Sequence, residues 1–190
     1  FKVGMIEPAQ FLGRCEDTLG TNVPFNANIP SEEIFITPKK GVAEGIGYAS
    51  KPLSYQGQLI ENFSVRFENG KAVEVKAEKN EDLLKSIIAM DENSAYLGEV
   101  ALVPYDSPIR NSEILLYNTL FDENAACHLA FGEGFTNCLK DLTLEQCRER
   151  GINDSLVHVD FMIGNEDLNI TAITRDGKRV PIFKDGNWAF

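Results

Sequence analysis

The stretch NFSVRFENGKAVEVKAEK, Asn62–Lys79, is the most informative part of the sequence about the fold. Apolar and polar residues alternate on both sides of Asn69-Gly70, which is the period of strands with one buried face. Asn-Gly is the favoured pair for a two-residue hairpin turn, because both turn positions need a positive φ. The sequence therefore predicts an antiparallel hairpin within Leu59–Lys79.

Helical and strand segments alternate around this hairpin. Capping residues and helical periodicity predict short helices at Glu81–Met90 with Asn80 as N-cap, at Asp122–Phe131, and at Leu142–Arg150. Apolar or alternating runs predict strands at Ser31–Pro38, Ala95–Pro104 and Ser155–Ile163, and a last hairpin of Leu168–Thr174 and Lys178–Phe183. Phe1–Pro30, rich in Gly, Asn and Pro, is predicted to be irregular. We therefore expect an α+β fold, with a β-rich mixed or antiparallel sheet and a few short helices.

Composition narrows the class of protein. The chain has 190 residues, 43% of them apolar and 25% charged, which is typical of one globular domain. No apolar run approaches the roughly 18–20 residues that cross a bilayer. The net charge of −11 argues against a nucleic-acid partner and suits cationic ligands such as metal ions or free amino termini. We expect a cytoplasmic protein with no membrane partner.

The chain start and the cysteines give two further expectations. The first residue is Phe1, and Phe1–Gly13 lacks the pattern of a signal peptide, so we expect a fragment of a longer protein. The four cysteines show neither a CxxC pair nor zinc-ribbon spacing, and we expect buried, reduced thiols: Cys15, Cys127, Cys138 and Cys147.

Several polar residues lie within apolar segments. His158 and Asp160 are two residues apart on a predicted strand and so share a face, which makes either a metal platform or a polar outer face. Glu99 lies in a predicted buried strand, where a carboxylate needs a metal, an ion pair or access to solvent. Of Glu32 and Glu33, neighbours on a predicted strand, one should face inward and one outward.

The other histidine of the chain, His128, lies in the middle of a predicted helix. Glu123 lies five residues earlier, roughly 140° around an ideal helix, and would reach a common site from the helix start. His128 itself is either a metal ligand or a hydrogen-bonded structural residue.

Glu33, Glu99, His128, His158 and Asp160 together offer two imidazoles and three carboxylates. This donor set is too rich in oxygen for a structural zinc site and suits two catalytic divalent ions. The sequence contains no HExxH, GxSxG, P-loop or GxGxxG motif. It therefore gives no indication of a zinc protease of the HExxH type, a serine hydrolase, a P-loop NTPase or a dinucleotide-binding enzyme.

Five blocks of sequence resemble one family of enzymes. NANIPSEEIFITP, YLGEVALVP, NAACHLAFG, HVDFMIG and GKRVPIFKDGNWAF occur in this order between Thr21 and Phe190. Together they resemble the aminopeptidase T / aminopeptidase S family of bacterial dinuclear metallo-aminopeptidases. The resemblance implies that residues 1–190 form the C-terminal metal-binding catalytic domain, with a separate N-terminal domain outside this sequence. It also implies a homodimer for the full-length protein.

The resemblance also implies a set of metal ligands. Carried over block by block, it assigns Glu33, with Glu32 as a near rival, then Glu99 as the bridging carboxylate, and finally Glu123, His128, His158 and Asp160. One position departs from the family, because relatives carry a tyrosine seven residues after the histidine where this chain has Phe135. The hydrogen bond of a phenol is therefore missing, and either another group replaces it or the activity is altered.

The expected activity is removal of N-terminal residues from peptides by water that two divalent ions, zinc, cobalt or manganese, make more acidic. Glu32, Glu33 and Glu123 are the candidate proton shuttles. Two alternatives stay open: a dinuclear esterase or phosphoesterase, and a non-catalytic peptide- or metal-binding domain. Lys39, Lys40 and Arg110 are too scattered to favour a phosphate substrate.

Overall fold

The computed structural model describes residues 1–13, 15–18 and 20–190. Its strands are β1 (Lys2–Met5), β2 (Leu12–Gly13), β3 (Cys15–Asp17), β4 (Pro24–Asn26), β5 (Ile34–Ile36), β6 (Pro38–Tyr48), β7 (Leu53–Tyr55), β8 (Gln58–Glu68), β9 (Lys71–Lys79), β10 (Leu97–Leu102), β11 (His128–Gly132), β12 (His158–Met162), β13 (Ile170–Ile173), β14 (Arg179–Lys184) and β15 (Asn187–Trp188). The short helices are α1 (Glu81–Ile87), α2 (Pro108–Asn111), α3 (Thr119–Asp122) and α4 (Leu144–Arg150), with 3-10 turns η1 (Glu123–Ala125) and η2 (Thr136–Cys138).

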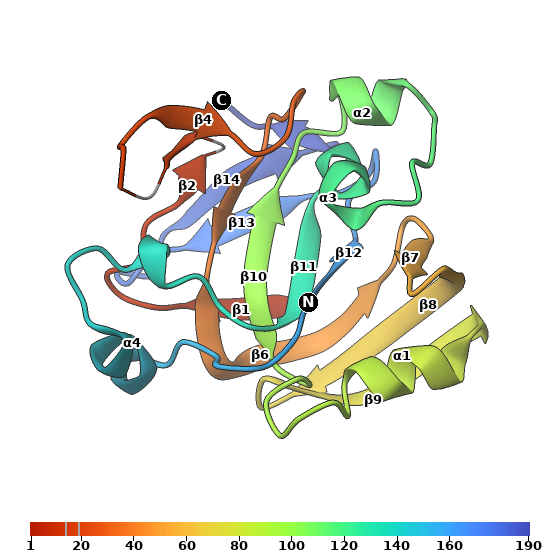
Figure 1. The fold of residues 1–190 in the computed structure, drawn as a ribbon, viewed down its shortest axis with the longest axis horizontal. Helices are drawn as coiled ribbons and strands as arrows, with labels where there is room; N and C mark the ends of the chain where they lie inside the picture. Colours follow the sequence, from red (N-terminus) through yellow and green to blue (C-terminus); the bar gives the residue numbers. More distant parts are fainter. Residues whose placement is uncertain (14, 19) are drawn as a thin grey trace.

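Two five-stranded sheets organise the molecule (Figure 1). The first has the order β1-β6-β8-β7, with β9 also paired to β8, and the second has the order β12-β11-β10-β5-β2. A three-stranded sheet, β13-β14-β15, and a two-stranded ribbon, β3-β4, complete the described strands. The strand pairs among the described residues are antiparallel, which confirms the predicted β-rich α+β fold in its antiparallel form.

The predicted hairpin is confirmed as β8-β9. Asn69 and Gly70 have φ of 50° and 79°, the positive values that a two-residue turn of this kind needs. Gly70 also has no room for a side chain, because a Cβ there would lie 2.3 Å from the Cα of Gly41. The residues of the turn therefore favour this register of β8 against β9 without help from packing.

Phenylalanine rings join the two large sheets. Phe63 on β8 lies 5.9 Å from Phe161 on β12, and Phe67 on β8 lies 6.3 Å from Phe131 on β11, measured between ring centroids. Phe131 and Phe161 stack on each other at 4.7 Å. These rings are buried, so the core lies between the hairpin sheet and the inner face of the β10-β11-β12 sheet.

The predicted helix at Asp122–Phe131 is wrong. The helical part ends in α3 and η1, and the chain then enters β11, a central strand paired with β10 on one side and β12 on the other. Alanine and leucine favour a helix locally, but hydrogen bonds to two neighbouring strands outweigh that preference. Asp122 does not begin a helix, and its carboxylate accepts hydrogen bonds from the backbone of Leu116 and Asn118.

The prediction that Phe1–Pro30 is irregular is also wrong in part. The segment contains β1 to β4, and of these β1 and β2 pair with β6 and β5, which come later in the chain. Strands of two to four residues carry too little alternation to be recognised, so distant partners define them. Strand β6 was missed for a related reason, since its eleven residues are mostly exposed and include two glycines with positive φ, Gly41 and Gly45.

The other predicted elements are confirmed, with ends that differ by a few residues. Helix α4 has the capping box of Thr143 and Gln146 and ends at Gly151, whose φ is 100°. Asn80 does precede α1, but its side chain donates to the carbonyl of Leu59 instead of capping the helix. Among the described residues, no helix is long and apolar enough to span a membrane.

Candidate metal centre

One face of the β10-β11-β12 sheet carries a row of ionisable side chains. Glu99 pairs with Ala130, and Ala130 pairs with Asp160, so all three point to the same side of the sheet. His128 and His158 lie two residues from Ala130 and Asp160 along their strands and therefore share this face. The strand register alone thus brings two carboxylates and two imidazoles together.

Small residues lie opposite the two histidines in the neighbouring strands. Ala101 pairs with His128, and Gly132 pairs with His158. A Cβ on Gly132 would lie 2.0 Å from the carbonyl oxygen of Val157, and its φ is 93°. The positions between the ionisable groups therefore carry a methyl group or a hydrogen.

The opposite face of the same strands is apolar and buried, and it belongs to the main core. This alternation keeps the strands fixed while the other face stays polar. The residues of the buried face are Val100, Leu129, Phe131, Val159 and Phe161.

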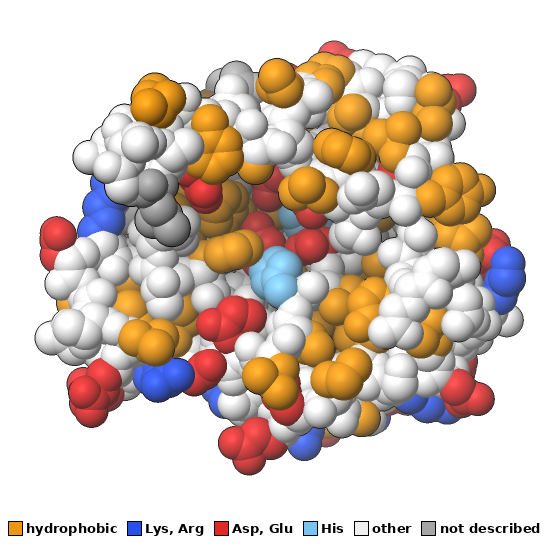
Figure 2. All heavy atoms as spheres, in the orientation of Figure 1, with side chains coloured by type: hydrophobic (Ala, Val, Ile, Leu, Met, Phe, Trp, Pro, Cys, Tyr) orange, Lys and Arg blue, Asp and Glu red, His pale blue; other side chains and the backbone are white. Residues whose placement is uncertain are grey.

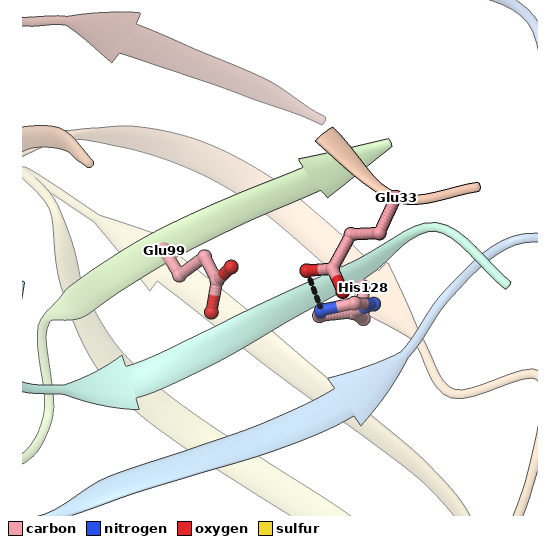
Figure 3. A group of neighbouring side chains, drawn as sticks. All are labelled: Glu33, Glu99 and His128. Atoms are coloured by element: carbon pink, nitrogen blue, oxygen red, sulfur yellow. Dashed lines mark ion pairs between the residues drawn. The ribbon is translucent and has the colours of Figure 1, made fainter. Parts of the chain in front are cut away.

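His128 is held from one side by backbone and faces a carboxylate on the other. Its Nδ1 donates to the carbonyl oxygen of Ala126 at 3.0 Å, because a carbonyl can only accept. Its Nε2 lies 3.4 Å from Glu33 Oε1, and only 1% of the side chain is exposed; in the neutral ring this nitrogen would carry the lone pair. Figure 3 shows Glu33, Glu99 and His128 converging from three segments of the chain.

His158 repeats this arrangement. Its Nδ1 donates to the carbonyl oxygen of Glu133 at 2.8 Å. Its Nε2 lies 3.1 Å from Glu99 Oε2 and 3.3 Å from Asp160 Oδ1. A histidine whose Nδ1 proton is bound by a backbone carbonyl presents Nε2 as a ligand, which is the usual setting of a metal-binding imidazole.

The ligand atoms form three overlapping groups, in each of which the atoms lie within 4.8 Å of one another. Glu99, His128 and Asp160 each belong to two groups. The groups are Glu33-Glu99-His128, Glu99-His158-Asp160 and Glu123-His128-Asp160.

Two buried atoms in this cluster have no hydrogen-bond partner among the described residues, His128 Nε2 and Asp160 Oδ1. Leaving such atoms unpaired is costly, and a cation between them removes the cost. The donor set of imidazole nitrogens and carboxylate oxygens also suits zinc, cobalt or manganese. The residues present therefore fit a metal site.

Without a cation, the cluster shares protons between its own groups. Burial lowers the pKa of both imidazoles. The neighbouring carboxylates together raise it by a larger amount, so that the pKa reaches about 10 for His128 and about 11 for His158. Burial raises the pKa of Glu99. Burial acts in the same direction on Asp160, but His158 and His128 together outweigh it and lower the pKa of Asp160. A metal ion that binds here must displace the protons of the imidazoles.

Glu123 reaches the cluster from η1, directly before β11. Its carboxyl is mostly buried, and burial followed by the charge of Asp160 raises its pKa to about 9. In the described chain no helix joins Glu123 to His128, so the angle between these two side chains is not that of a helix. The turn between η1 and β11 is what brings Glu123 toward His128 and Asp160.

The structure separates Glu33 from Glu32. Glu33 precedes β5 and faces His128, whereas Glu32 is exposed and belongs to none of the three groups among the described residues. The inward and outward directions were predicted, although neither residue lies within the strand itself.

The hollow that holds the cluster is open to solvent on one side. Histidine and acidic side chains gather near the centre of one face, with apolar side chains around them (Figure 2). The His158 side chain is 27% exposed, compared with 4% for Glu99, so a substrate would meet His158 first. Phe135 lies beside this opening, with its ring 4.8 Å from that of His158 and 4.9 Å from that of Phe35.

Glu133 contributes to the site in a way that the sequence did not predict. Its backbone carbonyl accepts the Nδ1 proton of His158. Any residue type has a backbone carbonyl, so the identity of Glu133 does not reveal this contact. In the sequence, only the neighbouring Gly132 and Gly134 could have suggested an unusual backbone conformation at this position.

Comparison with known proteins identifies the family. Residues 1–188 match the family described as thermophilic metalloprotease (M29). The chain belongs to the M29 family. This membership agrees with the metal-binding chemistry of the cluster.

Relatives of this M29 chain include aminopeptidases from several bacteria. It is 56% identical over 169 residues to aminopeptidase AmpS of Bacillus subtilis, covering 87% of this chain and 41% of the relative. It is 44% identical over 187 residues to aminopeptidase T of Thermus thermophilus, covering 98% of this chain and 46% of the relative. The chain thus spans less than half the length of these relatives.

A solved structure shares the fold. Wild-type AmpT from Thermus thermophilus superposes with a TM-score of 0.92 at 44% sequence identity, over 99% of this chain and 47% of that chain. The sheets that carry the cluster therefore belong to an M29 architecture over essentially all of the present chain.

Proposed function

We propose that this chain is the metal-binding catalytic domain of an aminopeptidase. The observation that carries the proposal is the set of three overlapping ligand groups on one sheet of an M29 chain. The aminopeptidase names of its relatives, AmpS and aminopeptidase T, support the substrate class, a peptide with a free amino terminus.

Two divalent ions, zinc, cobalt or manganese, would be held by these residues. Glu33 and His128 would serve one ion, His158 and Asp160 the other, and Glu99 would serve both, because it belongs to both groups. When bound, such ions supply Lewis acidity, which polarises a carbonyl and makes water a stronger acid.

Glu123 is the proton donor and acceptor that the cluster favours. Burial and the charge of Asp160 raise the pKa of its carboxyl, and from η1 this carboxyl reaches His128 and Asp160, so it would pass a proton to the leaving amine. The geometry favours it over the other two candidates, because Glu33 is directed at His128 and Glu32 is exposed. Phe135 offers no hydrogen bond, so the chain's own acid groups would supply this proton.

The site would also select the end of the substrate. A free α-amino group in its neutral form has a lone pair that one of the divalent ions would accept, whereas an acylated amine has none to offer. Exopeptidase specificity would then follow from this contact and from the open side at His158.

Metal content and turnover test the proposal. Equilibrium dialysis against Zn²⁺ should give two ions per chain, in this chain and in a protein extended to the length of its relatives. The extended protein should hydrolyse leucine amide and leave N-acetyl-leucine amide intact. Equal hydrolysis of both amides, or no bound zinc, would contradict the proposal.

A second candidate rests on Phe135, which brings a phenyl ring to the edge of the site. A domain that binds metal and peptide without turnover would bind two zinc ions and hydrolyse nothing. Phe135→Tyr would separate the two cases, since a gain in turnover with unchanged zinc content indicates a working site that lacks one hydroxyl group.

Homodimer formation by the full-length protein, its separate N-terminal domain and its cytoplasmic location remain predictions from the sequence and the resemblance. Analytical ultracentrifugation of the extended protein would measure its assembly.

A further inference from the structure

The segment that leads into β12, residues 153–157, is held mainly by polar contacts. Leu156 is 88% exposed, and Val157 is the one apolar residue of the segment that packs against the core. The Asp91 carboxylate accepts from the backbone of Leu156 at 2.8 Å and from Ser155 Oγ at 2.7 Å. The Asn93 side chain donates to the carbonyl of Asp154 at 2.6 Å.

Glu133 contacts this segment with two of its groups and His158 with a third. Its carboxylate accepts from the backbone N–H of Ser155 at 2.5 Å, and its backbone N–H donates to the carbonyl of Val157 at 2.7 Å. Its carbonyl oxygen accepts from Nδ1 of His158 at 2.8 Å. One residue thus binds both the segment before β12 and the imidazole at the start of β12.

The Glu133 carbonyl is itself tightly confined. A Cβ on Gly98 would lie 1.9 Å from this oxygen, so the absence of a side chain on β10 is what admits it. On the far side, the backbone N–H of Gly134 donates to the carbonyl of Asn153 at 2.9 Å. The oxygen that receives the His158 proton therefore has little freedom to move.

The two histidines differ in how their Nδ1 atoms are held. His128 donates to Ala126, two residues earlier in the chain and just before β11, and depends on no side chain for this bond. His158 donates to a residue 25 positions away, whose place relative to β12 is held by the backbone pairing of β11 with β12 and, from the side chain, by the Ser155–Glu133 bond. A side-chain substitution can therefore disturb one imidazole and leave the other as it is.

We propose that Glu133 is a positioning residue for His158. Its carboxylate fixes the segment before β12, so that its own carbonyl holds the Nδ1 proton and keeps Nε2 directed at Glu99 and Asp160. The inference rests on the metal centre proposed above. Partners of this kind, one bond beyond the ligand, typically change metal affinity by about 10–100-fold.

The test compares Glu133→Ala with the wild type in Zn²⁺-loaded protein. Glu133→Ala should weaken the binding of one of the two zinc ions by about 10–100-fold in a competition titration. In protein labelled with ¹⁵N-histidine, the Nδ1 proton of His158 should exchange faster with water, whereas that of His128 should not change. The two histidines thus serve as probe and internal control within one spectrum.

Matched variants separate positioning from general loss of stability. Glu133→Gln keeps an oxygen that accepts from Ser155 and should stay close to the wild type. Glu44→Ala removes a carboxylate bond to the backbone of Asn69 in the hairpin sheet and should leave both imidazole protons and zinc binding unchanged. If Glu133→Ala does not fold, Glu133→Asp keeps the charge with a shorter reach and is measured in its place.

Three results would overturn the inference: unchanged zinc binding in Glu133→Ala, equal acceleration of both imidazole protons, or a Glu133→Gln variant as impaired as Glu133→Ala. A wild-type chain that binds no zinc would overturn the proposed function and this inference together. Zinc-loaded wild type with an unaffected Glu133→Ala variant would overturn only the inference.

Discussion

At the scale of single residues, the cluster depends on which ring nitrogen of each histidine is free. Both Nδ1 atoms donate to backbone carbonyls, those of Ala126 and Glu133, so both Nε2 atoms face carboxylates. Glu99 lies between these imidazoles and is only 4% exposed. A buried carboxylate shared by two ligand groups is the natural bridge between two ions.

Glu99→Gln should abolish the binding of two ions together and lower aminopeptidase turnover by about 100-fold or more, because the effect of a ligand should exceed that of its outer partners. The amide keeps the volume of the side chain but loses the charge that both ions require. Zinc stoichiometry by dialysis and hydrolysis of leucine amide measure the two effects. Full turnover with two ions bound would rule out the bridging role.

Gly98→Ala should destabilise the fold by about 1–3 kcal/mol, because its Cβ would lie 1.9 Å from the Glu133 carbonyl oxygen. Zinc affinity should fall as well, since that carbonyl holds His158. Gly47→Ala is the control: Gly47 also lies in a strand, and a Cβ there meets nothing within 4 Å. Urea unfolding of both variants tests this, and equal stability would contradict the packing argument.

At the scale of elements, the site is assembled from strand ends and short connections around one sheet. β10, β11 and β12 supply the central side chains, whereas Glu33 precedes β5 and Glu123 lies in η1. Turns held by side-chain acceptors place these connections. The best example is the turn at Asp91, whose carboxylate binds the backbone of Asn93 and of Leu156.

Asp91→Asn should destabilise the protein at pH 7 by about 1–3 kcal/mol, as expected for a lost charged acceptor. Burial raises the pKa of Asp91, but the hydrogen bonds to its carboxylate lower it further, to about 2. Because the folded pKa lies below the unfolded value, the stabilisation is complete above about pH 4 and is lost toward pH 2.

Urea unfolding between pH 7 and pH 3 measures this effect. The difference between wild type and Asp91→Asn should shrink as the pH falls. Asp82→Asn, at a fully exposed carboxylate of α1, should show little difference at any pH. A gap between wild type and Asp91→Asn that stays constant down to pH 3 would show that the Asp91 charge is not the cause.

At the scale of the whole molecule, an acidic chain gathers carboxylates and imidazoles in a hollow over one face of the β10-β11-β12 sheet, and acidic and histidine side chains are seen near the centre of this face in Figure 2. The apolar core on the other side of the sheet is continuous with the hairpin sheet. A bound cation would therefore stabilise the hollow more than the core.

Removing metal should lower the melting temperature. A ligand at 100 times its dissociation constant stabilises by about 2.7 kcal/mol, which is about 5–10 °C for a chain of this size. Thermal unfolding with Zn²⁺ and after treatment with EDTA measures the shift. Glu99→Gln should show a smaller shift, and an equal shift in that variant would place the stabilising ion elsewhere.

Local patterns were sufficient where one element carries its own signal. The Asn69-Gly70 turn, the capping box of α4 and the alternation of β12 all act within a few residues, and each prediction is confirmed. His158 and Asp160 share a face for the same reason, because residues two apart on a strand point to the same side whichever neighbour the strand pairs with.

Other features depend on contacts between distant segments, which no local pattern contains. His128 lies on a strand instead of a helix because β10 and β12 pair on both sides of it. Glu32 and Glu33 are equivalent as residue types, and only the approach of Glu33 to His128 separates them. The sequence by itself determined the β-rich fold and the donor types, because propensity and charge are local. The tertiary structure alone decided which donors meet, because strand register fixes distances between segments far apart in the chain.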